Sequence, residues 1–444
     1  MPHPLSRRKF ISTTSAVVAA AQLPSLAVAD PAAAGAKLAV AGGEKAVKSS
    51  GGKLVRWGDP ERQRLNAMLD QSTLFYWKGP QTTALIERVQ QHHPMKHVMT
   101  CSSGTAALHI AVAAAGIGPG DEVITTGITD QGTVVGILFQ QAVPVFVDLE
   151  ADTANLSVEA VARAITPKTK AILAVHLTGN PCDLNGLKAL ADRHKLVLIE
   201  DCAQAWGAKY RGQPVGTIGH IACFSLQNAK HVHCGDGGVV GSNDDRFGPL
   251  LQRFGDKGMD RLAEKPFDST AVLGTNYRMS EPQAAVAAAQ MDRLESIAAK
   301  RARLGELLTE GITGLPGIVP PRVNSGDRAT CWFYMFMLNP DRLTCSRAEF
   351  AKALQAEGAP SGAGYIALPL YKLPVFQRHA FFAGRWPVRE LGLTAMDYTK
   401  VSCPTTESIL ERCMRITIHE AMSETYIKEI AAAVRKVAKH YARA

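Results

Sequence analysis

Residues 196–205 read Leu-Val-Leu-Ile-Glu-Asp-Cys-Ala-Gln-Ala, an apolar run that ends in two adjacent acids. Four consecutive apolar residues followed by polar ones are typical of a buried strand that stops at the edge of a sheet. Residues 224–230 follow as Phe-Ser-Leu-Gln-Asn-Ala-Lys, and then comes Gly235-Asp236-Gly237-Gly238. Asp201 is therefore expected at the carboxyl end of a strand, and Lys230 on a later loop.

An acid and a lysine in this arrangement can hold a flat, electron-poor ring between them. The acid would pair with a ring nitrogen and the lysine would form an imine with a ring aldehyde, which is how pyridoxal 5'-phosphate (PLP) is held. Taken singly, an Asp at a strand end usually caps the next helix, and a lone Lys usually lies in solvent. The pair Asp201 and Lys230 becomes a site only with support from the surrounding sequence.

The composition is that of a globular protein of two or three domains. Of the 444 residues, 46% are apolar and 20% are charged, and the formal charge is +9. Arg7, Arg8 and Lys9 supply three of these charges, so the rest of the chain is only mildly basic. No basic run is interleaved with aromatic residues, and we expect no nucleic-acid partner.

Nine cysteines are scattered along the chain, and none forms a Cys-x-x-Cys pair. This spacing argues against zinc and redox motifs, so no metal site is expected. An odd number cannot all pair within one chain, and several lie in apolar runs as small core residues. The pattern indicates a chain that folds in a reducing compartment.

Residues 1–29 have the pattern of a twin-arginine export signal. Ser6-Arg7-Arg8-Lys9-Phe10-Ile11 carries the signature, an Ala-rich segment follows, and Ala27-Val28-Ala29 offers small residues for cleavage. Gln22 and Pro24 make the segment a poor membrane span, so no stable membrane insertion is expected. Twin-arginine export carries folded proteins, and we expect a bacterial periplasmic protein. The alternative is an ordinary basic amphipathic N-terminus, which would leave the protein in the cytoplasm.

Behind this segment we expect an arm and a large domain. Residues 30–70 form the arm, of which 30–53 is rich in Ala, Gly and Lys and is expected to be loosely held. Residues 71–310 form the large domain, where short apolar strands alternate with helical stretches, as in a mostly parallel sheet covered on both faces. Its last part, 280–310, reads as one or two long helices that link the domains. In such sheets the ligand lies outside the carboxyl ends of the strands.

Ser103-Gly104-Thr105 opens an expected helix that runs to about Ala115. A helix start exposes unpaired N–H groups and a partial positive charge, so it can bind a phosphate group. Gly104 would let the backbone approach closely, and Thr105 would add a hydroxyl. The alternative is a plain N-cap that serves only the helix. Asp201 and Lys230 farther along the chain favour the phosphate site.

Residues 311–444 form the expected small domain. Residues 332–338 and 414–418 read as strands, Ser346-Arg347-Ala348-Glu349 is a capping box, and a closing amphipathic helix runs from Thr425 to Tyr441. This pattern predicts a compact α+β unit. Its candidates for contact with a substrate are listed last, although packing is the preferred role for each: Tyr365, Tyr371 and His419.

The order and spacing of these motifs resemble the DegT/DnrJ/StrS family of PLP-dependent sugar aminotransferases. The family is a branch of the aspartate aminotransferase fold, type I. The resemblance therefore implies an α/β fold, with a mostly parallel seven-stranded sheet in the large domain and a smaller C-terminal α+β domain. The similar segments are Ser-Gly-Thr-Ala-Ala-Leu at 103–108, Gly-Pro-Gly-Asp-Glu-Val-Ile at 118–124, Pro-Val-Phe-Val-Asp at 144–148, Glu200-Asp201 with Gln204, Phe224-Ser225 with Lys230, Gly237-Gly238, and Asn276 with Arg278-Met279.

The resemblance also implies a role for each matching residue. Lys230 would carry the cofactor and move protons, and Asp201 would keep the ring nitrogen protonated. Gln204 would bond the phenolic oxygen of the ring. Gly104, Thr105 and Ser225 would hold the phosphate, next to Ser103. Asn276 would reach the phosphate of a neighbouring subunit, which implies a homodimer with shared active sites.

One position departs from the family pattern. By alignment, Asp130 lies where family members place an aromatic ring that stacks on the PLP face, so we count it with the cofactor site. A carboxylate cannot stack. It could accept a hydrogen bond from a substrate amine or hydroxyl, or it could cap the helix from Gln131. The substrate preference is therefore expected to differ from the family norm.

The resemblance implies an aminotransferase that moves an amino group from an amino acid to a keto-sugar or keto-cyclitol by a ping-pong imine mechanism. Leu38-Ala39-Val40 with Gly42-Gly43, and Gln227 before the lysine, are most similar to the branch that aminates keto-cyclitols with glutamine. Dehydratases of the family carry histidine in place of Lys230. Two alternatives stay open: another PLP reaction, such as racemisation, elimination or dehydration, and an exported sugar-binding protein that has lost turnover.

Overall fold

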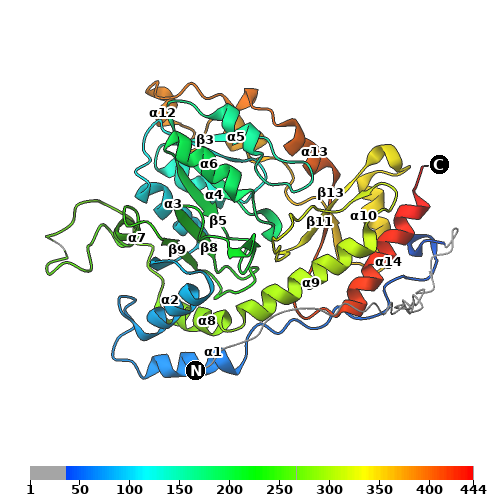
Figure 1. Cartoon of the computed structure of the whole chain (residues 1–444), viewed down its shortest axis with the longest axis horizontal. Helices are drawn as coiled ribbons and strands as arrows, with labels where there is room; N and C mark the ends of the chain where they lie inside the picture. The colour runs from blue at the N-terminus through cyan, green and yellow to red at the C-terminus, as the bar shows by residue number, and fades with distance from the viewer. Residues whose placement is uncertain (1–36, 267, 444) are drawn as a thin grey trace, which may run out of the picture.

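The computed structural model describes residues 37–266 and 268–443, so the expected export signal lies outside the described residues. Seven strands form the central sheet in the order β1-β9-β8-β5-β4-β2-β3 (Figure 1). β9 runs antiparallel to both of its neighbours, and the other pairs are parallel. The expected α/β class with a mostly parallel seven-stranded sheet is confirmed. The strands are β1 (His97–Cys101), β2 (Glu122–Thr126), β3 (Val143–Val147), β4 (Thr169–Val175), β5 (Val197–Asp201), β8 (Ile221–Ser225) and β9 (Gly238–Ser242).

Helices cover both faces of this sheet because its central strands are apolar on both sides. In β4, Ile172 and Ala174 face one core while Ala171 and Leu173 face the other. The first core includes residues of α2 (Pro80–His92), α5 (Val158–Ala164), α6 (Leu184–His194) and α8 (Glu281–Met291). The second core includes residues of α3 (Gly104–Ala114), α4 (Gly132–Phe139) and α7 (Gly248–Gly255).

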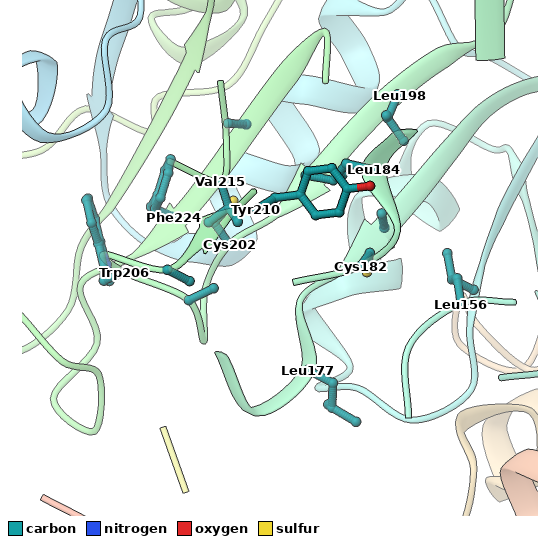
Figure 2. Packing of buried hydrophobic residues seen from close by; sticks show 14 of the residues in the cluster. Leu156, Leu177, Cys182, Leu184, Leu198, Cys202, Trp206, Tyr210, Val215 and Phe224 are labelled. Carbon is teal, nitrogen blue, oxygen red and sulfur yellow. The ribbon is translucent and has the colours of Figure 1, made fainter. Parts of the chain in front are cut away.

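Figure 2 shows part of the first core, beside the strand that ends at Asp201. The rings of Trp206 and Phe224 lie 4.3 Å apart between centroids, tilted by 34°. The Trp206 indole N–H donates to the carbonyl of Ser225 at 2.7 Å, so the buried ring is satisfied and also fixes the end of β8. Nearby, the short hairpin of β6 (Lys209–Tyr210) and β7 (Gln213–Pro214) covers the edge of this core.

The small domain is a four-stranded antiparallel sheet in the order β10-β11-β13-β12. Its strands are β10 (Ile318–Val319), β11 (Tyr334–Leu338), β12 (Ser361–Ala363) and β13 (Cys413–Ile416). Three helices pack on it, namely α9 (Leu294–Ile312), α10 (Arg347–Ala356) and α14 (Glu424–His440). In Figure 1, α9 continues from α8 under the large domain to the small one, as expected for residues 280–310.

Residues 370–403 lie in sequence between β12 and β13 of the small sheet but pack on the edge of the large one. Phe376 and Tyr398 contact Phe146 of β3, and the Tyr398 hydroxyl donates to the carbonyl of Pro144 at 2.9 Å. The helices of this region are α11 (Pro374–Gln377), α12 (Pro387–Glu390) and, next along the chain, α13 (Pro404–Arg412). The division of the chain at residue 310 stays a prediction.

The expectation of a loosely held arm needs correction for its described part. Leu38 and Val47 are buried in the small-domain core. The carboxylate of Glu357 accepts the N–H of Ala39 at 2.8 Å and that of Ala46 at 2.9 Å. The Ala- and Gly-rich composition missed this because both contacts come from the distant α10 region. Farther on, α1 (Asp59–Leu69) packs against α8. Within the described residues, no helix is both long and apolar enough to span a bilayer.

Candidate active site

The expected site residues gather at the carboxyl edge of the large sheet. Asp201 is the last residue of β5 and Ser225 the last of β8. β1 leads directly into Ser103 and α3, and Asp130 follows β2. Lys230 lies on the loop after β8, where its backbone N–H bonds the carbonyl of Gln227. Parallel strands that end at one edge explain why residues so far apart in sequence come together.

Asp201 is a buried carboxylate with two protein donors. It is 3% exposed, its Oδ1 accepts the N–H of Ala203 at 3.0 Å, and its Oδ2 accepts the hydroxyl of Thr133 at 2.9 Å. Burial raises the pKa of Asp201 above its usual value, against the opposing effects of these donors and of Lys230. A protonated ring nitrogen next to Asp201 would carry a positive charge, which favours the ionised form of the buried carboxylate.

Lys230 extends into the same space. Its Nζ lies 4.0 Å from the centre of the Trp332 ring, and the indole N–H of Trp332 donates to the carbonyl of Ala229 at 2.7 Å. Burial lowers the pKa of Lys230, whereas the charges of Asp201 and Asp130 act to raise it. A lysine whose pKa is lowered by burial has more of its amine in the neutral form, the form that attacks a carbonyl carbon.

Gln204 connects the two domains at the site. Its Oε1 accepts the N–H of Thr178 at 2.8 Å, which fixes the direction of the amide. Its Nε2 donates to the hydroxyl of Tyr365 at 3.1 Å. The ring of Tyr365 packs on Phe333 with centroids 5.0 Å apart. The sequence favoured simple packing for Tyr365, and the structure adds a hydrogen bond to a predicted site residue.

The expected phosphate residues meet at the start of α3. A Cβ built on Gly104 would lie 2.7 Å from the Cβ of Ser225, so only glycine allows this approach. Thr105 is the next residue of the helix. The Ser103 hydroxyl accepts the N–H of Ala106 at 3.0 Å, which is the cap that the sequence left open as an alternative. The cap and a phosphate cradle are compatible, because the first N–H groups of α3 still point outward.

Two other candidates lie at the rim. Asp130 is exposed, and its Oδ1 accepts the N–H of Gly132 at 2.8 Å, so it takes the capping role that was one of its two alternatives. Asn276 is also exposed, and its Oδ1 accepts the Arg278 Nε–H at 2.8 Å. Tyr371 is buried, and its hydroxyl donates to Glu407 at 3.0 Å, in keeping with a packing role. Burial lowers the pKa of His419.

A second acid, Glu200, precedes Asp201 in β5 and is bonded on the buried side of that strand. It is fully buried, and its oxygens accept the N–H groups of Gly216 and Ile218 at 2.7 and 3.1 Å. His176 contacts it through Nε2 at 3.0 Å, while His176 Nδ1 accepts the N–H of Cys182. The acceptor role of Nδ1 places the proton on Nε2, which donates to Glu200. With these atoms already bonded, the cluster is a structural brace for β5.

These residues fit PLP by their chemistry. A buried carboxylate, a lysine of lowered pKa, a fixed amide and a glycine-lined helix start would match the ring nitrogen, the aldehyde, the phenolic oxygen and the phosphate in turn. The sequence missed two contributors, Thr133 and Trp332. Thr133 lies three residues after Asp130, but nothing in that local sequence points to Asp201. Nothing in the sequence around Trp332 points to Lys230.

Comparison with known proteins gives one family over most of the chain. The profile of the DegT/DnrJ/EryC1/StrS aminotransferase family matches residues 57–435. L-glutamine:2-deoxy-scyllo-inosose aminotransferase of Streptomyces kanamyceticus is 35% identical over 374 residues, 80% of this chain and 84% of that protein. GDP-perosamine synthase of Caulobacter vibrioides is 37% identical over 268 residues, 60% of this chain and 71% of that protein. The crystal structure of 3-amino-5-hydroxybenzoic acid synthase superposes with a TM-score of 0.76 at 27% identity, covering 88% of this chain and 99% of the other. The chain belongs to the DegT/DnrJ/EryC1/StrS aminotransferase family.

Proposed function

We propose that this aminotransferase uses PLP to move an amino group from an amino acid to a keto-sugar or keto-cyclitol. The observation that carries the proposal is the placement of Lys230 on the loop after β8, the strand that pairs with β5, which ends in the buried Asp201. The charge of Asp201 also acts to raise the pKa of Lys230. A binding protein would need neither the amine of lowered pKa nor the buried carboxylate at this edge of the sheet. Gln204 and the close approach of Gly104 to Ser225 complete the same edge.

When bound, PLP supplies an aldehyde that captures amines and a ring that accepts the electron pair left on the substrate carbon. Lys230 Nζ would hold the cofactor and carry a proton to and from that carbon. Asp201 would hold the proton on the ring nitrogen, and Thr133 keeps the Asp201 carboxylate oriented. Gln204 would orient the ring through its phenolic oxygen. The N–H groups at the start of α3 would hold the phosphate.

The names of the relatives support a carbohydrate-like acceptor. One relative is named for a deoxy-inosose, which is a keto-cyclitol, and another for a nucleotide-linked sugar. The first of these is also named for glutamine as the donor. Together with the motifs at 38–43 and at Gln227, these names support glutamine as the first donor to test and a keto-cyclitol as the first acceptor.

A spectrum of the purified protein with PLP tests this function. We expect a visible absorbance band that shifts on addition of glutamine, glutamate or alanine and returns on addition of a keto-cyclitol. Lys230→Ala should abolish both the band and the transfer, whereas Lys352→Ala, on the exposed face of α10, should change neither. Full activity in Lys230→Ala would remove the assignment. A bound sugar without any spectral change would favour the binding protein.

We also propose that the active enzyme is a homodimer with shared sites. Asn276 is exposed, and on the same connection between α7 and α8 lie Leu262 and Leu273, which are 81% and 83% exposed. This connection projects from the side of the large sheet in Figure 1. Apolar side chains on a projecting loop are suited to burial against a second copy. Mixing an Asn276→Ala protein with a Lys230→Ala protein would test the sharing of sites, since only mixed dimers would restore one intact site.

Export to the periplasm is the last part of the proposal. It is supported by Arg7-Arg8 and by the Ala-Val-Ala at 27–29. The nine cysteines are all free, which suits a chain that folds before export. Replacing both arginines with lysine should retain the protein in the cytoplasm, and fractionation of cells would measure this. An unprocessed chain that stays in the cytoplasm with the arginines intact would contradict export.

A further inference from the structure

One carboxylate at the site has no part in the chemistry described so far. Asp130 is exposed at the rim, and only one of its oxygens is occupied, by the N–H of Gly132 at 2.8 Å. Its Oδ2 has no hydrogen-bond partner among the residues that the structure describes. The family pattern would place an aromatic ring here, so the chain presents a charged acceptor where an apolar face is expected.

The turn that carries Asp130 is held between two parts of the cofactor site. A Cβ built on Gly132 would lie 2.5 Å from the Thr105 hydroxyl oxygen, so the turn touches the start of α3. On its other side, Thr133 donates to Asp201 at 2.9 Å. Asp130 therefore cannot move far without disturbing Thr105 or Asp201. The turn therefore holds the exposed Asp130 close to the residues expected to bind the cofactor.

Charges of opposite sign act on the residues near Asp130. The negative charge of Asp130 acts on both Lys230 and the Tyr365 hydroxyl. On the small-domain side, the charge of Arg415 also acts on Tyr365, and the Arg415 guanidinium lies 5.8 Å from the centre of the Phe333 ring. The Tyr365 hydroxyl, which accepts a hydrogen bond from Gln204 Nε2, is thus influenced by a carboxylate from the large domain and a guanidinium from the small one.

We propose that Asp130 is a specificity-determining residue that accepts hydrogen bonds from the hydroxyl groups of the acceptor and turns the donor's carboxylate away from its side of the site. This inference rests on the proposed function. An acceptor with several hydroxyl groups and no negative charge near its carbonyl group satisfies Asp130. An acceptor that carries a carboxylate beside its carbonyl is repelled. The site is therefore built for a polyhydroxylated ketone such as a cyclitol.

The size of the effect follows from the hydrogen bond involved. Hydrogen bonds to charged acceptors correspond to about 10- to 100-fold in affinity. Asp130→Asn keeps the side-chain oxygen that caps Gly132 but removes the charge. We expect the KM for the acceptor to rise by about 10- to 100-fold, while the KM for the donor falls or stays the same because a repulsion is lost. Opposite responses of the two substrates distinguish recognition from a general loss of structure.

The test uses the full chain with glutamine as donor and scyllo-inosose as acceptor. Asp183→Asn is the matched control, because Asp183 also caps a helix, accepting the N–H of Gly186 at 3.2 Å at the start of α6. It should leave both KM values unchanged. Binding of scyllo-inosose to the PLP-free protein, followed by tryptophan fluorescence, gives a second readout, since Trp332 lies beside Lys230.

An unchanged acceptor KM and unchanged binding in Asp130→Asn would overturn the inference, as would a parallel rise of both KM values. Absence of any amino transfer by the wild-type protein would instead count against the proposed function. In that case the fluorescence titration still decides the role of Asp130, because it needs neither PLP nor turnover.

Discussion

Replacing Thr133 with Val should make the stability of the protein depend more strongly on pH. Thr133 is 2% exposed, and its hydroxyl donates to Asp201 Oδ2 at 2.9 Å. Valine keeps the branched shape but cannot donate a hydrogen bond. The substitution therefore leaves a buried carboxylate with one donor fewer, the N–H of Ala203 remaining. It also removes the contact between the Thr133 and Thr129 hydroxyls, which lie 2.7 Å apart.

The magnitude depends on the protonation state of Asp201. Burial already holds the pKa of Asp201 above its usual value, and loss of a donor to the ionised form raises it further. A hydrogen bond to an ionised group contributes about 1.5–3 kcal/mol and a neutral one about 0.5–1.5 kcal/mol. The pH-dependent part of the loss is therefore about 1–1.5 kcal/mol, or about one pKa unit.

The sign follows from the direction of the shift. An acid whose pKa is raised in the folded state makes its most favourable contribution to the free energy of unfolding below its unfolded pKa of about 3.9, where it is protonated in both states. That contribution is lost as the pH rises through the folded pKa. The folded state binds the proton more tightly than the unfolded state does, so ionising Asp201 costs more free energy in the folded state. Thr133→Val should enlarge the loss. The variant and the wild type should differ least near pH 4 and most at pH 7–8.

The assay is urea unfolding of the PLP-free protein across this pH range, followed by tryptophan fluorescence. Thr125→Val is the matched control: Thr125 is also fully buried, but its hydroxyl donates at 2.9 Å to a neutral acceptor, the carbonyl of Leu173. Its cost should be the same at every pH. A Thr133→Val difference that is equally flat with pH would refute the account of Asp201 given above.

Two further substitutions test the close contacts of the fold. Gly104→Ala brings a Cβ to 2.7 Å from the Cβ of Ser225. Overpacking of this kind costs about 1–3 kcal/mol. Calorimetric titration of the variant with PLP should therefore show at least tenfold weaker binding. Gly118→Ala, where a Cβ meets nothing within 4 Å, is its control, and equal binding by both variants would contradict the cradle. Glu357→Ala removes the carboxylate that accepts the N–H groups of Ala39 and Ala46 and pairs with Lys436. Amide hydrogen exchange of residues 39–46 should therefore become faster. Unchanged protection would mean that apolar packing alone holds the arm.

The local signals in the sequence were sufficient for the elements around Asp201 and for the class of fold. A parallel strand covered on both faces must be apolar throughout, so residues 196–199 were recognisable as a central strand, and strands that alternate with helices imply that their carboxyl ends share an edge. The closing helix of the small domain was expected from Thr425 to Tyr441 and runs from Glu424 to His440, because its apolar period and its cap are local. The placement of Asp201 and Lys230 at one edge follows from the same rules.

Contacts between segments far apart in the chain needed the tertiary structure. The arm was expected to be loose because its own composition is Ala- and Gly-rich, yet its N–H groups bond Glu357, more than 300 residues away. In the same way, residues 370–403 have no local feature that assigns them to the large sheet, where Tyr398 packs against Phe146.

The roles of particular side chains divide along the same line. The sequence predicted Lys230 and Asp201 as partners from their combination with the motifs around them, since either residue alone has ordinary structural roles. Only the folded chain showed that Thr133 supports Asp201, that Trp332 lies over Lys230, and that Asp130 caps a helix with one oxygen and leaves the other open. Hydrogen bonds and charges act across space at distances of a few ångströms, and that proximity is created by packing rather than by the order of residues along the chain.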